Sequence, residues 1–176
     1  MNIRQQLLQK NSRANADIVL NYVLGSPESV VELMVCFLSD EVTVAQRAAQ
    51  VVGDLGRQNP ESLEPWWEEM LRAGQQPVHD AIRRNIARYF SELSLALPSE
   101  LERSLVQLLT GWSCDLQTPV AITVFSMQFI ANRASRFPDE ADQIRAQIES
   151  RFPTGSAAFR SRGKLILTDL VDLNRC

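Results

Sequence analysis

The stretch DEVTVAQRAAQVVGDLG, residues 40–56, decides the fold class of this 176-residue chain. Its apolar residues recur at helical spacing, and the same spacing is found almost everywhere else in the sequence. Nowhere do alternating strand patterns occur with hairpin signals such as Asn-Gly or Asp-Gly between them. The sequence therefore predicts an all-α protein.

The composition predicts one folded domain over residues 1–176, because 45% of the residues are hydrophobic and 22% are charged. The most apolar stretch, residues 120–130, is too short to span a membrane and contains polar residues. The first residues lack the apolar core of a signal peptide. The cysteines are odd in number and lack metal-ligand spacing, namely Cys36, Cys114 and Cys176. We therefore expect a cytoplasmic protein with reduced thiols and no membrane partner.

Seven of the eight prolines stand at predicted helix boundaries, within or just before a first turn. Ser99 and Glu102 add a predicted capping box at one of these starts. Cutting the chain at these marks gives an N-terminal helical cap and four helix pairs of roughly 35–40 residues each. The cap covers residues 1–24, and the pairs cover residues 27–58, 61–93, 98–136 and 139–173. This period is typical of an α-α superhelix, a solenoid of stacked helical hairpins.

A second register supports the repeat. Arg47, Arg83, Thr123 and Arg162 fall at the same point early in the second helix of successive pairs, at spacings of 36, 40 and 39 residues. Three of these four residues are arginine, as expected for a repeated structural position.

Residues 40–56 resemble the second helix of a HEAT repeat. VHDAIRRNI at residues 78–86 and PVAITVFSM at residues 119–127 resemble segments of small bacterial HEAT-like repeat proteins. The resemblance implies a HEAT-like (armadillo-type) solenoid whose second helices line an inner, concave face and whose first helices form the outer face. It also implies that the arginines at the repeated position form a ladder that hydrogen-bonds between neighbouring repeats.

Proteins of that group often bear the name adenylosuccinate lyase. True lyases of this kind are much larger helical tetramers that use a serine on a Gly- and Ser-rich mobile loop, together with histidines for proton transfer. This chain has a single histidine, His79, and no such loop. The residues therefore predict no lyase activity.

Other catalytic or metal sites are equally poorly supported. Asp80 follows His79 directly, and adjacent helical side chains diverge by about 100°, so we expect a surface or helix-start histidine. Cys36 is predicted to lie in the core, Cys114 near a helix end and Cys176 at the exposed terminus. We expect no enzyme, no metal site and no cofactor.

The adjacent pair Trp66 and Trp67 predicts one buried ring and one ring nearer the surface. Core packing is the simpler interpretation. A tryptophan at a partner surface is the alternative, because tryptophan is enriched in binding hot spots.

The charges divide between the two sets of helices. The predicted first helices (27–38, 61–73, 98–115, 139–151) hold 4 basic and 13 acidic residues, whereas the second helices (42–58, 77–93, 118–136, 156–174) hold 10 basic and 5 acidic residues. Helix dipoles account for part of the acidic excess, and the ladder accounts for Arg47, Arg83 and Arg162. The remaining arginines are candidate partner-binding residues or part of a solvated face: Arg84, Arg88, Arg133, Arg136 and Arg160.

The sequence thus predicts a non-catalytic scaffold or protein-interaction module that binds an acidic or phosphorylated segment of a partner. Arginine outnumbers lysine 16 to 2, and its planar fork suits carboxylates and phosphates. Nucleic-acid binding is the alternative, against which stands a pI near 5.3.

Residues 120–130 are expected to form the central buried helix. The preceding helix is expected to pack on it through Leu101, Leu105, Leu108 and Trp112, which share one helical face.

Overall fold

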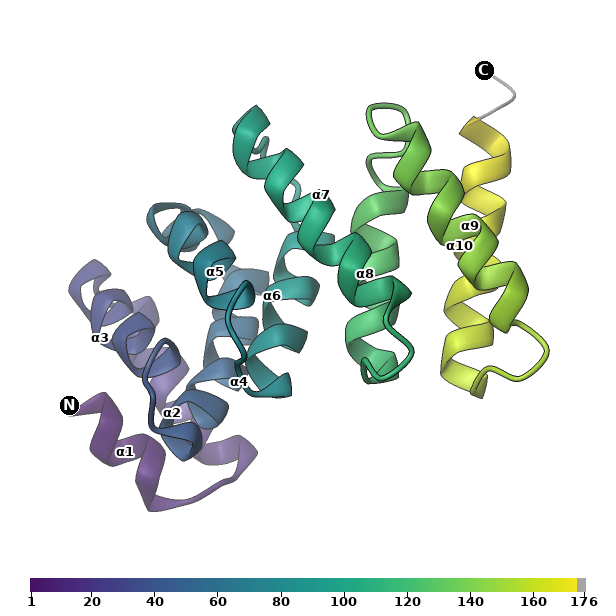
Figure 1. Ribbon diagram of the computed structural model, residues 1–176. Coiled ribbons are helices and arrows are strands. Elements are labelled where there is room, and N and C mark those ends of the chain that lie inside the picture. Colours follow the sequence, from purple (N-terminus) through teal and green to yellow (C-terminus); the bar gives the residue numbers. More distant parts are fainter. Residues whose placement is uncertain (174–176) are drawn as a thin grey trace. The chain divides into compact units, whose positions relative to one another are not determined.

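The computed structural model describes residues 1–173, and within them all regular secondary structure is helical (Figure 1). The prediction of an all-α fold is confirmed. No helix in this described part is both long and apolar enough to cross a membrane. Cys176 lies outside the described residues.

The described chain divides into two compact units. The N-terminal unit comprises Met1–Tyr89 and Leu93–Ala96, and the C-terminal unit comprises Phe90–Glu92 and the chain from Leu97 onward. The N-terminal unit contains α1 (Ile3–Gln9), α2 (Arg13–Leu24), α3 (Pro27–Phe37), α4 (Val42–Gln58), the 3-10 helix η1 (Pro60–Trp66), α5 (Trp67–Gly74) and most of α6 (Asp80–Glu92). The C-terminal unit contains α7 (Ser99–Cys114), α8 (Val120–Ala131), α9 (Pro138–Arg151) and α10 (Ala157–Leu173).

The N-terminal unit is built around α4. Helices α1, α2, α3 and η1 all pack on α4, and α3 also contacts α1, α2 and η1. Side-chain caps begin the first two helices, because Asn2 Oδ1 accepts from the Gln5 amide and Ser12 Oγ accepts from the Asn15 amide. Small and branched apolar residues of α4 are fully buried, so its neighbours approach its backbone closely.

One predicted helix is divided. The spacing predicts a single helix over residues 61–73, whereas the structure has η1 over Pro60–Trp66 and then α5 over Trp67–Gly74. Pro65 lies inside η1. Its ring removes an amide donor and crowds the carbonyl four residues earlier, so the tighter 3-10 turn replaces an α-helical turn there.

The C-terminal unit has two helical layers. Helix α7 packs against α8 and α9, and α10 packs against α8 and α9, so α7 and α9 form one layer and α8 and α10 the other (Figure 1). As predicted, α8 supplies much of the core, with Met127, Phe129 and Ile130 fully buried. Phe125 is only half-buried.

The buried face of α7 differs slightly from the predicted one. Leu101, Leu105 and Trp112 are buried as expected, but Leu109 is fully buried in place of Leu108, which is half-buried. The two leucines differ by one position, or about 100° around the helix. The predicted capping box is wrong, because Pro98 is the N-cap of α7 and Ser99 is its first helical residue.

Candidate functional site

Two of the predicted partner-binding arginines hold a buried carboxylate. Arg133 is 6% exposed and donates through Nε to Glu102 Oε1 at 2.8 Å. Arg136 donates through Nη1 to Glu102 Oε2 at 2.5 Å. Glu102 itself is 4% exposed. Arg133, a predicted partner-binding residue, is therefore buried in an ion pair inside the C-terminal unit.

Further contacts hold the Arg133 guanidinium in place. Its carbon lies 3.8 Å from the centroid of the Phe129 ring, and Nη1 donates to the Phe129 carbonyl at 3.2 Å. Burial lowers the pKa of Arg133, although Glu102 opposes the shift. Glu102, which the sequence suggested for a cap, is thus an internal acceptor between α7 and the end of α8.

The other predicted partner-binding arginines fall in both units. Arg84 and Arg88 lie on α6 in the N-terminal unit, where Arg84 is exposed and Arg88 is half-buried. Arg160 is exposed on α10 in the C-terminal unit and donates to the Gly155 carbonyl at 3.1 Å. Arg136 has a side chain that is 58% exposed despite its contact with Glu102.

Two predicted ladder arginines, Arg47 and Arg162, each donate a hydrogen bond to another helix. Arg47 on α4 donates to the Leu7 carbonyl of α1 at 2.7 Å, and Arg162 on α10 donates to Gln128 Oε1 of α8 at 3.1 Å. Arg83 pairs within its own helix, with Asp80 Oδ1 at 3.2 Å.

The histidine and the described cysteines occupy the places expected of them. His79 is the N-cap of α6, and its Nδ1 accepts from the Ala81 amide at 3.1 Å. Cys36 is buried, and burial raises the pKa of its thiol; Cys114 is exposed at the end of α7. Among the described residues no three His, Cys, Asp or Glu side chains converge as metal ligands.

The tryptophan pair separates as predicted. Trp67 is buried and donates through Nε1 to the Tyr89 hydroxyl at 2.8 Å. The Tyr89 hydroxyl in turn donates to the Pro60 carbonyl at 2.9 Å. This chain of bonds ties both ends of η1 to α6. Burial raises the pKa of Tyr89 to about 12, so the phenol remains a donor at neutral pH.

Trp66, the other member of the pair, is half-buried and lines a groove of about 690 Å³ in the N-terminal unit. We call it the Trp66 groove. Its apolar lining comes from the end of α2, from α3, α4 and η1, chiefly Leu24, Pro27, Val30, Val31, Leu55, Pro65 and Trp66. Its polar lining consists of Ser26, Asn59, Glu61, Ser62 and Glu69.

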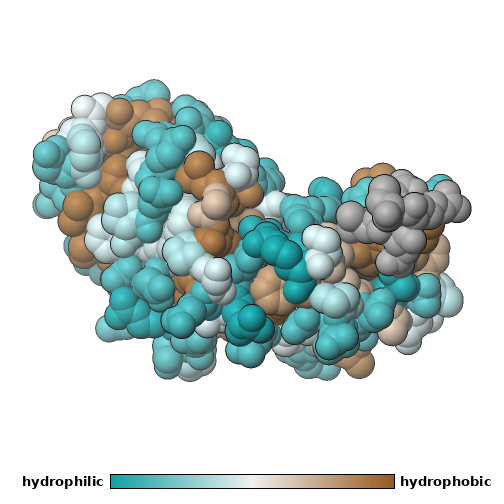
Figure 2. All heavy atoms as spheres, turned by 90° about the horizontal axis from the view of Figure 1, so that it is seen from above, coloured by the Kyte–Doolittle hydropathy of each residue, from teal (hydrophilic) through white to brown (hydrophobic). Residues whose placement is uncertain are grey.

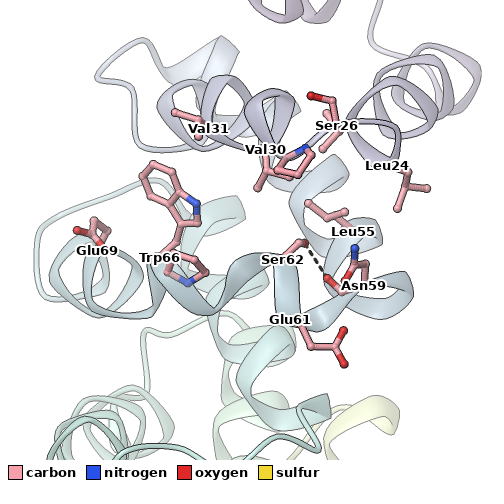
Figure 3. A pocket seen from close by; sticks show the side chains of 13 residues that line it. Leu24, Ser26, Val30, Val31, Leu55, Asn59, Glu61, Ser62, Trp66 and Glu69 are labelled. Carbon is pink, nitrogen blue, oxygen red and sulfur yellow. Dashed lines mark hydrogen bonds between the residues drawn. The ribbon is translucent and has the colours of Figure 1, made fainter.

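Figure 3 shows the Trp66 ring facing Val31 and Val30 across the groove, with Glu69 beside it. The Ser62 hydroxyl is already used, because it donates to the Asn59 carbonyl at 2.7 Å. The groove therefore offers mainly apolar surface. It has the size and lining of a binding site but no grouping of catalytic side chains.

A second groove of about 450 Å³ lies on the other side of α3. Its lining comes from the start of the chain, including Met1, Ile3 and Arg4, and from α3, including Val31, Glu32 and Val35. Val31 lines both grooves. Val31 is 49% exposed and Val35 is 63% exposed, so the outward ridge of α3 is apolar. Hydrophobic patches interrupt the hydrophilic surface of the face drawn in Figure 2.

The sequence matches no protein-family model, no curated protein and no solved structure. The function must therefore be inferred from the residues themselves.

Proposed function

We propose that this protein is a non-catalytic interaction module that holds a partner protein in the Trp66 groove. The observation that carries the proposal is the apolar side chains left open to water there: Trp66 is half-buried and Val31 faces it on α3. Tryptophan dominates many binding hot spots, and grooved apolar surface is a feature of interaction sites. An apolar side chain of a partner that entered the groove would remove both residues from water.

The support beneath Trp66 favours a binding role. Trp67, Tyr89 and Pro60 fix η1 through two hydrogen bonds of 2.8 and 2.9 Å. Trp66 is consequently presented on backbone that is already ordered. A preorganised surface loses less conformational entropy on binding, which leaves more of the contact free energy for affinity.

We further propose that the helix pairs are HEAT-like repeats. This proposal is supported by the two layers of the C-terminal unit, in which first helices contact first helices and second helices contact second helices. The bonds that Arg47 and Arg162 make to other helices suit ladder residues.

An arginine-mediated function is the second candidate. Arg84 supports it, because this exposed residue makes no ion pair or hydrogen bond within the described chain. Together with Arg88 on the next turn of α6, it would attract an acidic or phosphorylated segment of a partner.

A pair of matched valine variants tests the first candidate. Val31→Asp places a charge in the groove, whereas Val171→Asp makes the same change at a valine of α10 that is 46% exposed. Wild-type protein and both variants, each checked for helicity, are used to capture proteins from a native extract. We expect one identified partner to be retained by wild type and Val171→Asp and lost by Val31→Asp.

The captured partner is then purified and mixed with the wild-type chain. Hydrogen exchange should slow in α3 and η1. Equal retention by Val31→Asp, or protection confined to other helices, would refute the Trp66 groove as the binding site. Loss of the partner only in Arg84→Glu/Arg88→Glu would instead support the second candidate.

A further inference from the structure

The walls of the Trp66 groove carry charge of one sign. Residues 24–38 contain two glutamates, Glu28 and Glu32, and no Lys, Arg or His. Residues 59–71 contain four glutamates and again no basic residue. The side chains that line the groove include Glu61 and Glu69 but no cation. The apolar surface is therefore bordered by acidic residues.

The nearby contacts leave much of this negative charge in place. Glu61 is exposed at the start of η1 and makes no ion pair within the described chain. Glu69 is paired with Arg72 at 2.8 Å, and its side chain remains 36% exposed. Near the other end of the groove, the Ser26 hydroxyl donates to Glu28 and lowers the pKa of that carboxyl. Three arginines lie nearby, and each is paired: Arg72 with Glu69, Arg57 with Asp54, and Arg4, which lines the second groove, with Glu41.

The apolar surface has a length suited to a short helix. From Pro27 to Val35 the ridge of α3 rises about 12 Å, which is roughly two helical turns. Val31 lines the Trp66 groove and faces Trp66, and Val35, one turn further along the same ridge, lines the second groove, so the apolar ridge continues beyond the Trp66 groove. An amphipathic helix laid in a groove of this kind inserts apolar side chains from successive turns.

We propose that the Trp66 groove takes an amphipathic helix of a partner protein whose apolar stripe is flanked by lysine or arginine. This inference rests on the function proposed above and adds the chemistry of the partner. Apolar side chains enter between Val31 and Trp66, and the flanking cations lie against Glu61, Glu69 and Glu28. Complementary charge speeds encounter and disfavours acidic competitors.

A second copy of the chain is a poorer occupant. Its own groove walls would bring Glu28 and Glu61 toward the same residues of the first copy, and the whole chain has a net charge of −3. Like charges placed opposite one another weaken association.

Two synthetic peptides test the inference with the full-length protein. Each is a helical peptide of about 15 residues with a leucine stripe, and the polar positions are lysine in one peptide and glutamate in the other. Binding is followed by fluorescence anisotropy of the labelled peptide. We expect the lysine peptide to bind roughly tenfold more tightly at low salt, since several exposed ion pairs each contribute a little. The preference should shrink as salt rises.

Charge variants test whether the acidic rim of the groove, Glu61 and Glu69, causes the preference for the lysine peptide. Glu61→Lys/Glu69→Lys should reverse the preference, and the milder Glu61→Gln/Glu69→Gln should reduce it in case the reversal disturbs folding. Glu100→Lys/Asp139→Lys changes net charge equally at exposed first-turn positions of α7 and α9, and it should leave the preference intact.

The outcomes separate this inference from the proposed function. Equal binding of both peptides, or none, overturns the basic-helix inference, whereas the valine variants and the captured partner decide the proposed function independently. The last measurement is the oligomeric state, followed by analytical ultracentrifugation. A dimer that Val31→Asp converts to a monomer would mean that a second copy occupies the groove, and it would overturn the inference as well.

Discussion

Removing the carboxylate of Glu102 should destabilise the C-terminal unit strongly. Glu102 is 4% exposed, and the guanidinium it neutralises belongs to Arg133, which is 6% exposed. In Glu102→Ala, Arg133 keeps its bond to the Phe129 carbonyl and its place over the Phe129 ring but loses its charge partner. A buried charge left without its partner typically costs about 3–5 kcal/mol. That loss is a large part of the roughly 5–15 kcal/mol that stabilises a natural domain.

The assay is equilibrium urea denaturation followed by far-ultraviolet circular dichroism, with hydrogen exchange in α7 and α8 to locate the loss. Arg136→Met is the comparison variant. The Arg136 side chain is 58% exposed, and without it Glu102 keeps its bond to Arg133 but loses the donor to Oε2, so its removal should cost about 1–2 kcal/mol, less than Glu102→Ala.

A double variant distinguishes charge from packing. Glu102→Leu/Arg133→Met replaces the ion pair by apolar groups of similar size, and it should recover most of the stability lost in Glu102→Ala. A cost of less than about 1 kcal/mol for Glu102→Ala, or a double variant no more stable than the single one, would contradict a buried ion pair that stabilises this unit.

Three further predictions concern packing and titration. Met127→Ala should cost roughly 2–5 kcal/mol in urea denaturation, because Met127 is fully buried. Tyr89 should titrate at a pKa of about 12 in an absorbance titration, and Tyr89→Phe should remove that step. A raised pKa means that the folded protein holds the proton more tightly than the unfolded chain, so stability should decline as pH rises from about 10 toward 12. Gly53→Ala should lower the melting temperature, because the new Cβ would lie 2.4 Å from Asn85 Oδ1, whereas Gly111→Ala meets nothing within 4 Å and should be neutral or stabilising.

Most helix positions were predictable because local signals determine them. Proline and apolar spacing located α3, α4 and α9 to within a residue or two. The prediction failed at residues 60–66, where Pro65 stands inside an otherwise helical pattern and forces a 3-10 turn. It failed again at Glu102, because a serine followed three residues later by glutamate also occurs where the glutamate turns inward.

The candidate site was harder to predict because burial depends on partners distant in the sequence. Arg133 looked available on a basic helix, yet its acceptor Glu102 lies 31 residues earlier on another helix. The Trp66 groove was missed for another reason. Residues 27–38 are mostly apolar, which indicates a buried helix. Glu28 and Glu32 nevertheless share one helical face with Val31 and Val35, and this spacing is the local signal that the two valines face outward.

The exposed ridge of α3 also limits what can bind there. Complete burial of a valine side chain contributes about 1.5 kcal/mol, so covering the exposed parts of Val31 and Val35 would contribute less than about 2 kcal/mol together. Association costs about 4 kcal/mol or more in lost translational and rotational freedom, and the contacts must exceed this cost before binding becomes favourable. The two valines alone therefore cannot retain a partner. Trp66 and the acidic rim must supply much of the remainder, so binding should respond both to loss of the indole and to rising salt.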